Sequence, residues 1–284
     1  MTSAPLVDAA ALHLHHDDPS WIVVDCRFNL LEPSAGRAAY ARGHIPGARY
    51  ADLDRDLARR PNPTEGRHPL PSPAAFAAKL GDWGIGEHDT VVAYDDGSGA
   101  IASRLWWLLG WLGHERRAVL DGGFAAWQGA TLPIETQTPS FRPKRYPQRR
   151  VDEAGVVATA DLVSRQVAGD LVVDARAAPR YRGEQETIDP VAGHVPGARS
   201  WPFSNSVTAA GRFRPAHELR DDLRTLLGKR QPDQLIAMCG SGVTACHLLL
   251  AMAVAGLDGG KLFAGSWSEW IRDPARPIKT GAEP

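Results

Sequence analysis

Cysteine is scarce in this 284-residue chain, and neither sign of charge is in excess. The only cysteines are Cys26, Cys239 and Cys246, an odd and sparse set that excludes a disulfide scaffold. Lys and Arg total 32 against 33 Asp and Glu, so the chain lacks the basic face that broad nucleic-acid binding needs. No apolar run approaches the roughly 20 residues of a membrane span. We therefore expect a cytoplasmic protein that binds neither nucleic acid nor a membrane.

What the chain does contain is an internal repeat. The heptads Gly43–Arg49 (GHIPGAR) and Gly193–Arg199 (GHVPGAR) differ at one position. Three further blocks recur in the same order, pairing Trp21–Arg27 with Asp170–Arg176, Asp96–Ala102 with Cys239–Ala245, and Leu120–Trp127 with Phe263–Trp270. Two long copies indicate a duplicated domain rather than a solenoid. We expect one domain at 1–135 and another at 151–284, joined by a proline-rich linker at 136–150.

Each copy alternates short apolar runs with longer helical stretches. Buried strands are predicted at Ile22–Asp25, Val91–Tyr94, Val172–Asp174 and Leu235–Met238. Helices are predicted at Pro73–Leu80 (with Ser72 as N-cap), Ala102–Leu112 and Thr244–Ala255. This alternation predicts an α/β fold in which each copy is a mostly parallel sheet with helices on both faces. Sheets of this kind bind ligands beyond the carboxyl ends of their strands.

The two copies serve as controls for each other, because a feature present in both is expected to be structural. His44 and His194 of the heptads are in this class. So are the ion pairs expected between the aspartate and arginine that follow each first strand, at Asp25/Arg27 and Asp174/Arg176.

The copies differ where the strand Leu235–Met238 runs into the sequence CGSGVTAC. Backbone N–H groups of a glycine-rich loop between strand and helix form an anion-binding nest, and the helix N-terminus adds partial positive charge. A thiol held there is favoured as a thiolate nucleophile. The first copy has Asp96 at the position of Cys239, so we predict a degenerate first domain and a catalytic Cys239. Cys26 and Cys246 are expected to be packing residues, and without a Cys-x-x-Cys pair we predict no metal site.

These blocks resemble the tandem-domain rhodanese family of sulfurtransferases, from about Pro19 to Pro277. The resemblance implies two rhodanese-like domains, of which the second is catalytic, and a covalent Cys239 persulfide in place of a cofactor. The loop of Cys239, Gly240, Ser241, Gly242, Val243 and Thr244 is similar to the 3-mercaptopyruvate sulfurtransferase type. The thiosulfate type usually places Arg and Lys after the cysteine.

The resemblance also implies roles for residues outside the loop. Arg180 matches an arginine that grips the donor's anionic group, together with the loop residues Gly240, Gly242, Val243 and Thr244. A second arginine is common shortly downstream in mercaptopyruvate enzymes, but the stretch 184–189 contains none. His68 and Asp54 match a first-domain pair that faces Ser241, and these three side chains are expected to relay protons.

The expected function is therefore transfer of sulfur from 3-mercaptopyruvate to cyanide or a thiol, with a thioredoxin-like protein among the acceptors that the family suggests. The first alternative is a thiosulfate:cyanide sulfurtransferase that uses the same persulfide. A second alternative is a sulfur carrier or binding module without turnover. A Cys-x₅-Arg phosphatase is disfavoured, because the position that needs arginine is Ala245.

Overall fold

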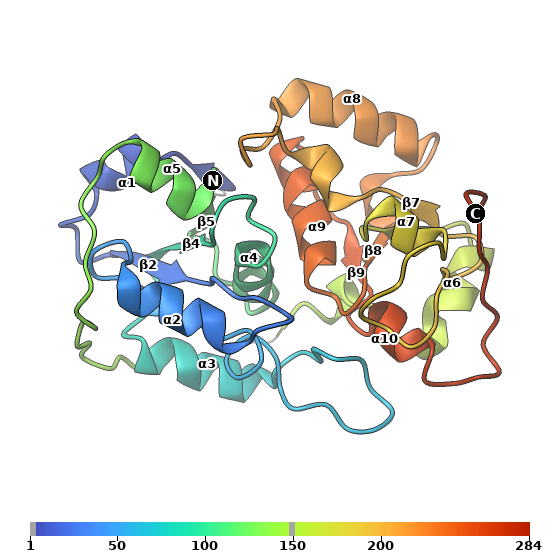
Figure 1. Cartoon of the computed structure of the whole chain (residues 1–284), viewed down its shortest axis with the longest axis horizontal. Coiled ribbons are helices and arrows are strands. Elements are labelled where there is room, and N and C mark those ends of the chain that lie inside the picture. The colour runs from blue at the N-terminus through green and yellow to red at the C-terminus, as the bar shows by residue number, and fades with distance from the viewer. Residues whose placement is uncertain (1–3, 148–150) are drawn as a thin grey trace. The chain divides into compact units, whose positions relative to one another are not determined.

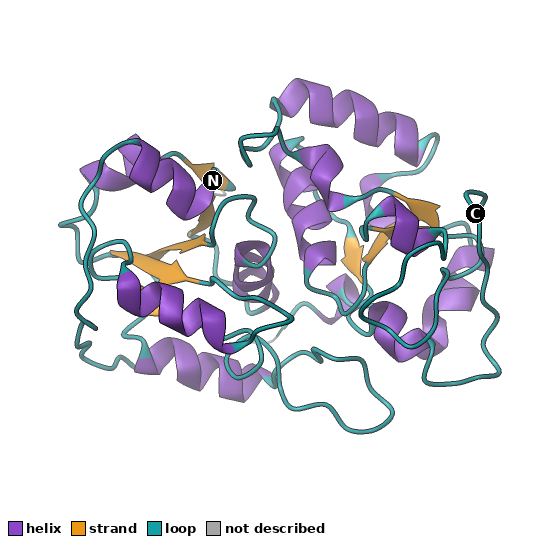
Figure 2. Ribbon diagram, in the orientation of Figure 1, coloured by secondary structure: helices purple, strands orange, loops and turns teal. Residues whose placement is uncertain are grey.

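The computed structural model describes residues 4–147 and 151–284, and the chain forms two compact units. Unit 1 comprises Met1–Arg59, Leu70–Asp152 and Ala209–Phe213. Unit 2 comprises Arg60–Pro69, Glu153–Thr208 and Arg214–Pro284. Figures 1 and 2 show that each unit consists of helices around its own set of strands.

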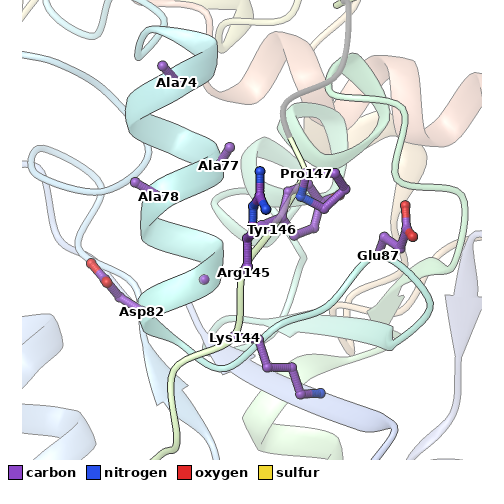
Figure 3. A pocket seen from close by; sticks show the side chains of 10 residues that line it. Ala74, Ala77, Ala78, Asp82, Glu87, Lys144, Arg145, Tyr146 and Pro147 are labelled. Carbon is purple, nitrogen blue, oxygen red and sulfur yellow. The ribbon is translucent and has the colours of Figure 1, made fainter.

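Three segments differ from the expected domains. Ala209–Phe213 comes from the second copy but belongs to unit 1. The segment Arg60–Pro69 comes from the first copy but belongs to unit 2, because its backbone is bound there: the amide of Arg67 donates to Ser268 Oγ at 3.0 Å. The expected linker at 136–150 is not a free connector, since the amide of Lys144 donates to the carbonyl of Gly81 at 3.0 Å. Figure 3 shows Lys144–Pro147 running beside helix α3. Residues 148–150 of that linker lie outside the described residues.

Unit 1 contains a five-stranded parallel sheet in the order β1-β5-β4-β2-β3. Its strands are β1 (Leu6–Val7), β2 (Trp21–Asp25), β3 (Arg49–Tyr50), β4 (Thr90–Tyr94) and β5 (Arg117–Leu120). Its helices are α1 (Ala9–Leu14), α2 (Ser34–Arg42), α3 (Pro73–Asp82), α4 (Ala102–Trp111) and α5 (Gly123–Gly129).

Unit 2 contains a four-stranded parallel sheet in the order β7-β6-β8-β9. Its strands are β6 (Leu171–Asp174), β7 (Arg199–Ser200), β8 (Leu235–Met238) and β9 (Lys261–Leu262). Its helices are α6 (Leu162–Val167), α7 (Ala178–Tyr181), α8 (Ala216–Leu227), α9 (Thr244–Val254) and α10 (Ser266–Trp270), with short 3₁₀ turns η1 to η4 between them.

The predicted strands and helices are confirmed to within a few residues. The apolar runs became strands because they are buried on both faces, as parallel strands require. Ser72 caps α3 as predicted, since its Oγ accepts from the amide of Ala75 at 3.2 Å. Among the described residues, no helix is long and apolar enough to cross a membrane.

The repeated heptads and ion pairs are structural, as expected. His44 Nδ1 lies 2.8 Å from the carbonyl of Tyr40, and His194 Nδ1 lies at the same distance from the carbonyl of Tyr181. Each histidine also stacks on that tyrosine with ring centroids 3.8 Å apart. Arg27 follows β2 and Arg176 follows β6. Each arginine lies 2.6 Å from the aspartate that ends its strand and donates to a glycine carbonyl at 2.7 Å. These contacts fix the carboxyl end of each sheet. In unit 2 the loop of Cys239 begins at that end.

Candidate active site

Cys239 follows directly after β8, at the carboxyl end of the central strands of unit 2. Its side chain is only 2% exposed. The amide of Gly242 donates to its Sγ at 3.2 Å, so the loop turns a backbone dipole toward the sulfur. Helix α9 begins five residues after the cysteine, at Thr244, and points its N-terminus toward the same loop.

Two local features hold this loop in shape. Gly242 has a φ of +78°, and a Cβ there would lie 2.5 Å from the carbonyl oxygen of Ala264, so only glycine fits. Ser266 takes a left-handed φ of +52°, which is costly for a residue with a side chain. Its Oγ accepts from the amide of Cys239 at 3.0 Å and lies 2.9 Å from the carbonyl of Phe263. Ser266 therefore orients the backbone of the cysteine, a role that the sequence analysis did not find.

The predicted pairing of Ser241 with His68 is present within unit 2. Ser241 Oγ and His68 Nδ1 lie 2.7 Å apart, and both side chains are buried. The segment Arg60–Pro69 brings the histidine to the loop. Asp54 belongs to unit 1, where its amide donates to Asp52 Oδ1 at 3.0 Å and its side chain is exposed. Its part in proton transfer stays a prediction.

Two guanidinium groups lie over the residue that follows the cysteine. A Cβ on Gly240 would be 2.9 Å from Nη2 of Arg67 and 3.6 Å from both terminal nitrogens of Arg180. Arg180 was predicted, and it comes from α7. Arg67 was not predicted, because it is far from Gly240 in the sequence and only the fold brings the two together. The loop itself is neutral, but cations from two other segments surround it.

Two carboxylates hold these arginines. Arg180 Nε donates to both oxygens of Glu186 at 3.0 Å, and its Nη2 lies 2.9 Å from Asp189 Oδ2. The other oxygen of Asp189 accepts from Nη1 of Arg67. Burial alone would raise the pKa of Glu186, but hydrogen bonds from Arg180 and from two backbone amides outweigh burial, so the pKa is lowered. These contacts join two arginines and two carboxylates in one network.

Cys26 and Cys246 are free thiols packed in the interior. Burial raises the pKa of the Cys26 thiol well above its ordinary value, with the nearby Asp25 carboxylate adding to the effect. Cys246 Sγ lies 3.3 Å from the carbonyl of Gly242. Of the three cysteines, Cys239 is the one placed at a strand end in a glycine-rich loop.

The backbone corrects the position equivalent to Cys239 in unit 1. The amide of Phe124 donates to the carbonyl of Asp95 at 2.8 Å, as the amide of Trp267 does to Cys239 at 3.0 Å. Asp95, not Asp96, therefore replaces the cysteine. Aligning the two copies without a gap gives Asp96 instead, because the loop from β4 to α4 is two residues longer than the loop from β8 to α9.

Unit 1 also lacks the other charged groups of the site. The stacked tyrosine and histidine align Ala39 of unit 1 with Arg180 of unit 2, since each precedes its tyrosine. That tyrosine and histidine are four residues apart in unit 1 and thirteen apart in unit 2. The longer segment of unit 2 carries Glu186 and Asp189. The differences between the copies thus gather at one site.

Among residues 4–147 and 151–284, no group of three His, Cys, Asp or Glu side chains is arranged to hold a metal. The groove between α3 and Lys144–Pro147, shown in Figure 3, is lined mainly by alanines and charged side chains and contains no cysteine, serine or histidine. A buried thiol beside an amide donor, a serine–histidine pair and two arginines can attack an anionic donor and move a proton.

Comparison with known proteins agrees with this geometry. A family model described as "Rhodanese-like domain" matches residues 8–130 and 159–273. A Pseudomonas aeruginosa protein named "Probable 3-mercaptopyruvate sulfurtransferase" is 48% identical over 99% of this chain and 100% of its own. The crystal structure of the Escherichia coli 3-mercaptopyruvate sulfotransferase SseA superposes with a TM-score of 0.79 and 31% identity, covering 94% of this chain and 100% of that one. A Mycobacterium tuberculosis protein named "Putative thiosulfate sulfurtransferase SseB" is 38% identical over 91% of this chain and 90% of its own.

Proposed function

This chain belongs to the rhodanese family of sulfurtransferases, and we propose that it takes sulfur from 3-mercaptopyruvate and passes it to a thiol or cyanide through a persulfide on Cys239. The observation that carries the proposal is the placement of Cys239 Sγ, 3.2 Å from the amide of Gly242 at a strand end. That amide and its neighbours in the loop stabilise the negative charge of both thiolate and persulfide.

The first half-reaction moves one sulfur atom. The Cys239 thiolate attacks the sulfur of the donor, an S–S bond forms and the donor's C–S bond breaks. The electron pair of that bond passes to the carbon side as the enolate of pyruvate. The proton released from the donor thiol is accepted by the Ser241–His68 pair and returned to the enolate carbon, which gives pyruvate.

The second half-reaction regenerates the enzyme. A thiol or cyanide acceptor attacks the outer sulfur of the Cys239 persulfide, the S–S bond breaks and the Cys239 thiolate is restored. A thioredoxin-like protein is one acceptor of suitable chemistry. The covalent persulfide makes a separate cofactor unnecessary, and the two-step cycle predicts ping-pong kinetics. We place this reaction in the cytoplasm, where thiols are kept reduced.

Arg180 supports a donor with a carboxylate, because arginine grips carboxylates in a bidentate way. The loop residues Gly240, Gly242, Val243 and Thr244 are proposed to surround the reacting sulfur. The proposal is tested by measuring kcat/KM for 3-mercaptopyruvate and thiosulfate side by side. We expect a higher value for 3-mercaptopyruvate, and a higher value for thiosulfate contradicts the assignment of the donor.

Thiosulfate remains the second candidate donor, because one observation favours it. Arg67 adds a second positive charge above Gly240, and a compact dianion benefits from two cations more than a monoanion does. Thiosulfate, however, has no proton to release, so it makes no use of the Ser241–His68 pair. That pair is the reason for preferring the thiol donor.

A further inference from the structure

We propose that Arg67 is the second anion-binding arginine of this site and that Asp189 positions it. The inference rests on the proposed sulfurtransferase function and adds a residue that binds the anionic group of the donor. Its starting point is that the guanidinium groups of Arg67 and Arg180 converge on Gly240, next to the nucleophile. A donor whose sulfur reaches Cys239 brings its anionic end within reach of both.

The charges of the cluster make Arg67 necessary. Arg180 alone faces two carboxylates, Glu186 and Asp189, which are 3% and 2% exposed. Those three groups sum to a net charge of −1. Arg176, 3.5 Å from Glu186, does not change this sum because Asp174 balances it. A net negative cluster repels an anionic donor. Arg67 restores neutrality and leaves guanidinium edges directed at the loop. Coulomb interactions between such partly buried groups are screened far less than those at a surface.

Arg67 is also held in place. Its amide donates to Ser268 Oγ at 3.0 Å, the amide before it lies 3.2 Å from Glu269 Oε2, and Asp189 binds its Nη1. Its side chain is 24% exposed, and its buried Nε has no hydrogen-bond partner among the described residues. One oxygen of Asp189 accepts from Arg67 and the other from Arg180, so Asp189 sets the distance between the two guanidinium groups.

The test uses the full-length protein and follows sulfur loading of Cys239 by intact mass at increasing concentrations of 3-mercaptopyruvate. Replacing Arg67→Met keeps an unbranched apolar stem but removes the guanidinium and its charge. Losing a charge-assisted hydrogen bond is expected to raise the half-saturating concentration roughly 10- to 100-fold, with a smaller effect on the maximal rate. Arg67→Lys should recover part of the loss. Arg272→Met is the matched control, because Arg272 binds the same segment at the carbonyl of Glu65.

A double variant separates contact with the donor from simple neutralisation of Asp189. Arg67→Met combined with Asp189→Asn restores the net charge without restoring the guanidinium. Asp189→Asn alone is the reference, because that change also loosens Arg180. If Arg67 binds the donor, half-saturation in the double variant stays above that of Asp189→Asn alone. If the two values are equal, Arg67 only neutralises Asp189 and the proposal is wrong.

The donor assignment can fail separately. Should the wild-type protein load from thiosulfate and not from 3-mercaptopyruvate, the proposed donor is wrong. The same variants are then titrated with thiosulfate, with the same expectation for Arg67. An unchanged half-saturation in Arg67→Met for the donor that the wild type uses overturns the inference.

Discussion

At the scale of single residues, comparison of the two copies of the repeat is enough to propose Cys239 and Arg180 as site residues. Cys239 and Arg180 stand out because the first copy has neither at the corresponding place. Ser241 and His68 were expected from the family resemblance, and their 2.7 Å contact supports a shared role. Arg67 and Ser266 escaped notice, because their importance depends on tertiary contacts that no spacing in the sequence reveals.

The Ser241–His68 pair should matter for one donor and not for the other. Ser241→Ala or His68→Asn is expected to slow loading of Cys239 from 3-mercaptopyruvate by about 10²- to 10⁴-fold, the usual contribution of general acid–base catalysis. Loading from thiosulfate should change little, because thiosulfate has no thiol proton. Stopped-flow or quenched loading rates for both donors measure this. Equal losses with both donors indicate that the pair only shapes the loop.

Ser266 is expected to position the nucleophile without contributing to stability. Ser266→Gly relieves a left-handed conformation but removes the acceptor for the Cys239 amide, and these effects on folding are both about 1 kcal/mol and opposite in sign. Unit 1 provides the precedent, since Gly123 holds the equivalent place with a φ of +54°. We therefore predict a near-normal urea unfolding midpoint together with slower sulfur loading. An unchanged loading rate contradicts the positioning role.

At the scale of structural elements, the loop after the central strand, β4 in unit 1 and β8 in unit 2, differs between the two units. In unit 1 the Asp95 carboxylate accepts from four backbone amides at 2.8 to 3.2 Å. The chain's own carboxylate therefore occupies the nest of unit 1. The strand and helix on either side were predictable from hydrophobic pattern, whereas the two extra residues in this loop were not, because glycine-rich loops carry no periodic signal.

This arrangement predicts a stabilising role for Asp95. Asp95→Ala leaves four backbone amides, two buried and two partly buried, without their acceptor. This loss should lower the free energy of unfolding by about 3 kcal/mol or more. Asp96→Ala is the matched control: its side chain is exposed, so a change below about 1 kcal/mol is expected. Urea denaturation measures both. Similar losses for the two variants contradict the assignment of Asp95 to the nest.

At the scale of the whole molecule, duplication produced two sheets with the same structural contacts and different chemistry. The tyrosine–histidine stacks and the aspartate–arginine pairs are alike in both units. Two units were predictable from the repeat, but the exchange of Arg60–Pro69 into unit 2 was not. That exchange brings Arg67 and His68 to the cysteine loop, so residues encoded by the first copy complete the site of the second.

The central claim is that one cysteine of this chain carries the transferred sulfur. Its most direct test is the intact mass of the protein after incubation with 3-mercaptopyruvate, followed by digestion to locate the added atom. We predict a gain of one sulfur per chain at Cys239, removed by dithiothreitol, absent in Cys239→Ser and retained in Cys246→Ser. A sulfur located on Cys26 or Cys246, or none after incubation with either 3-mercaptopyruvate or thiosulfate, contradicts the account.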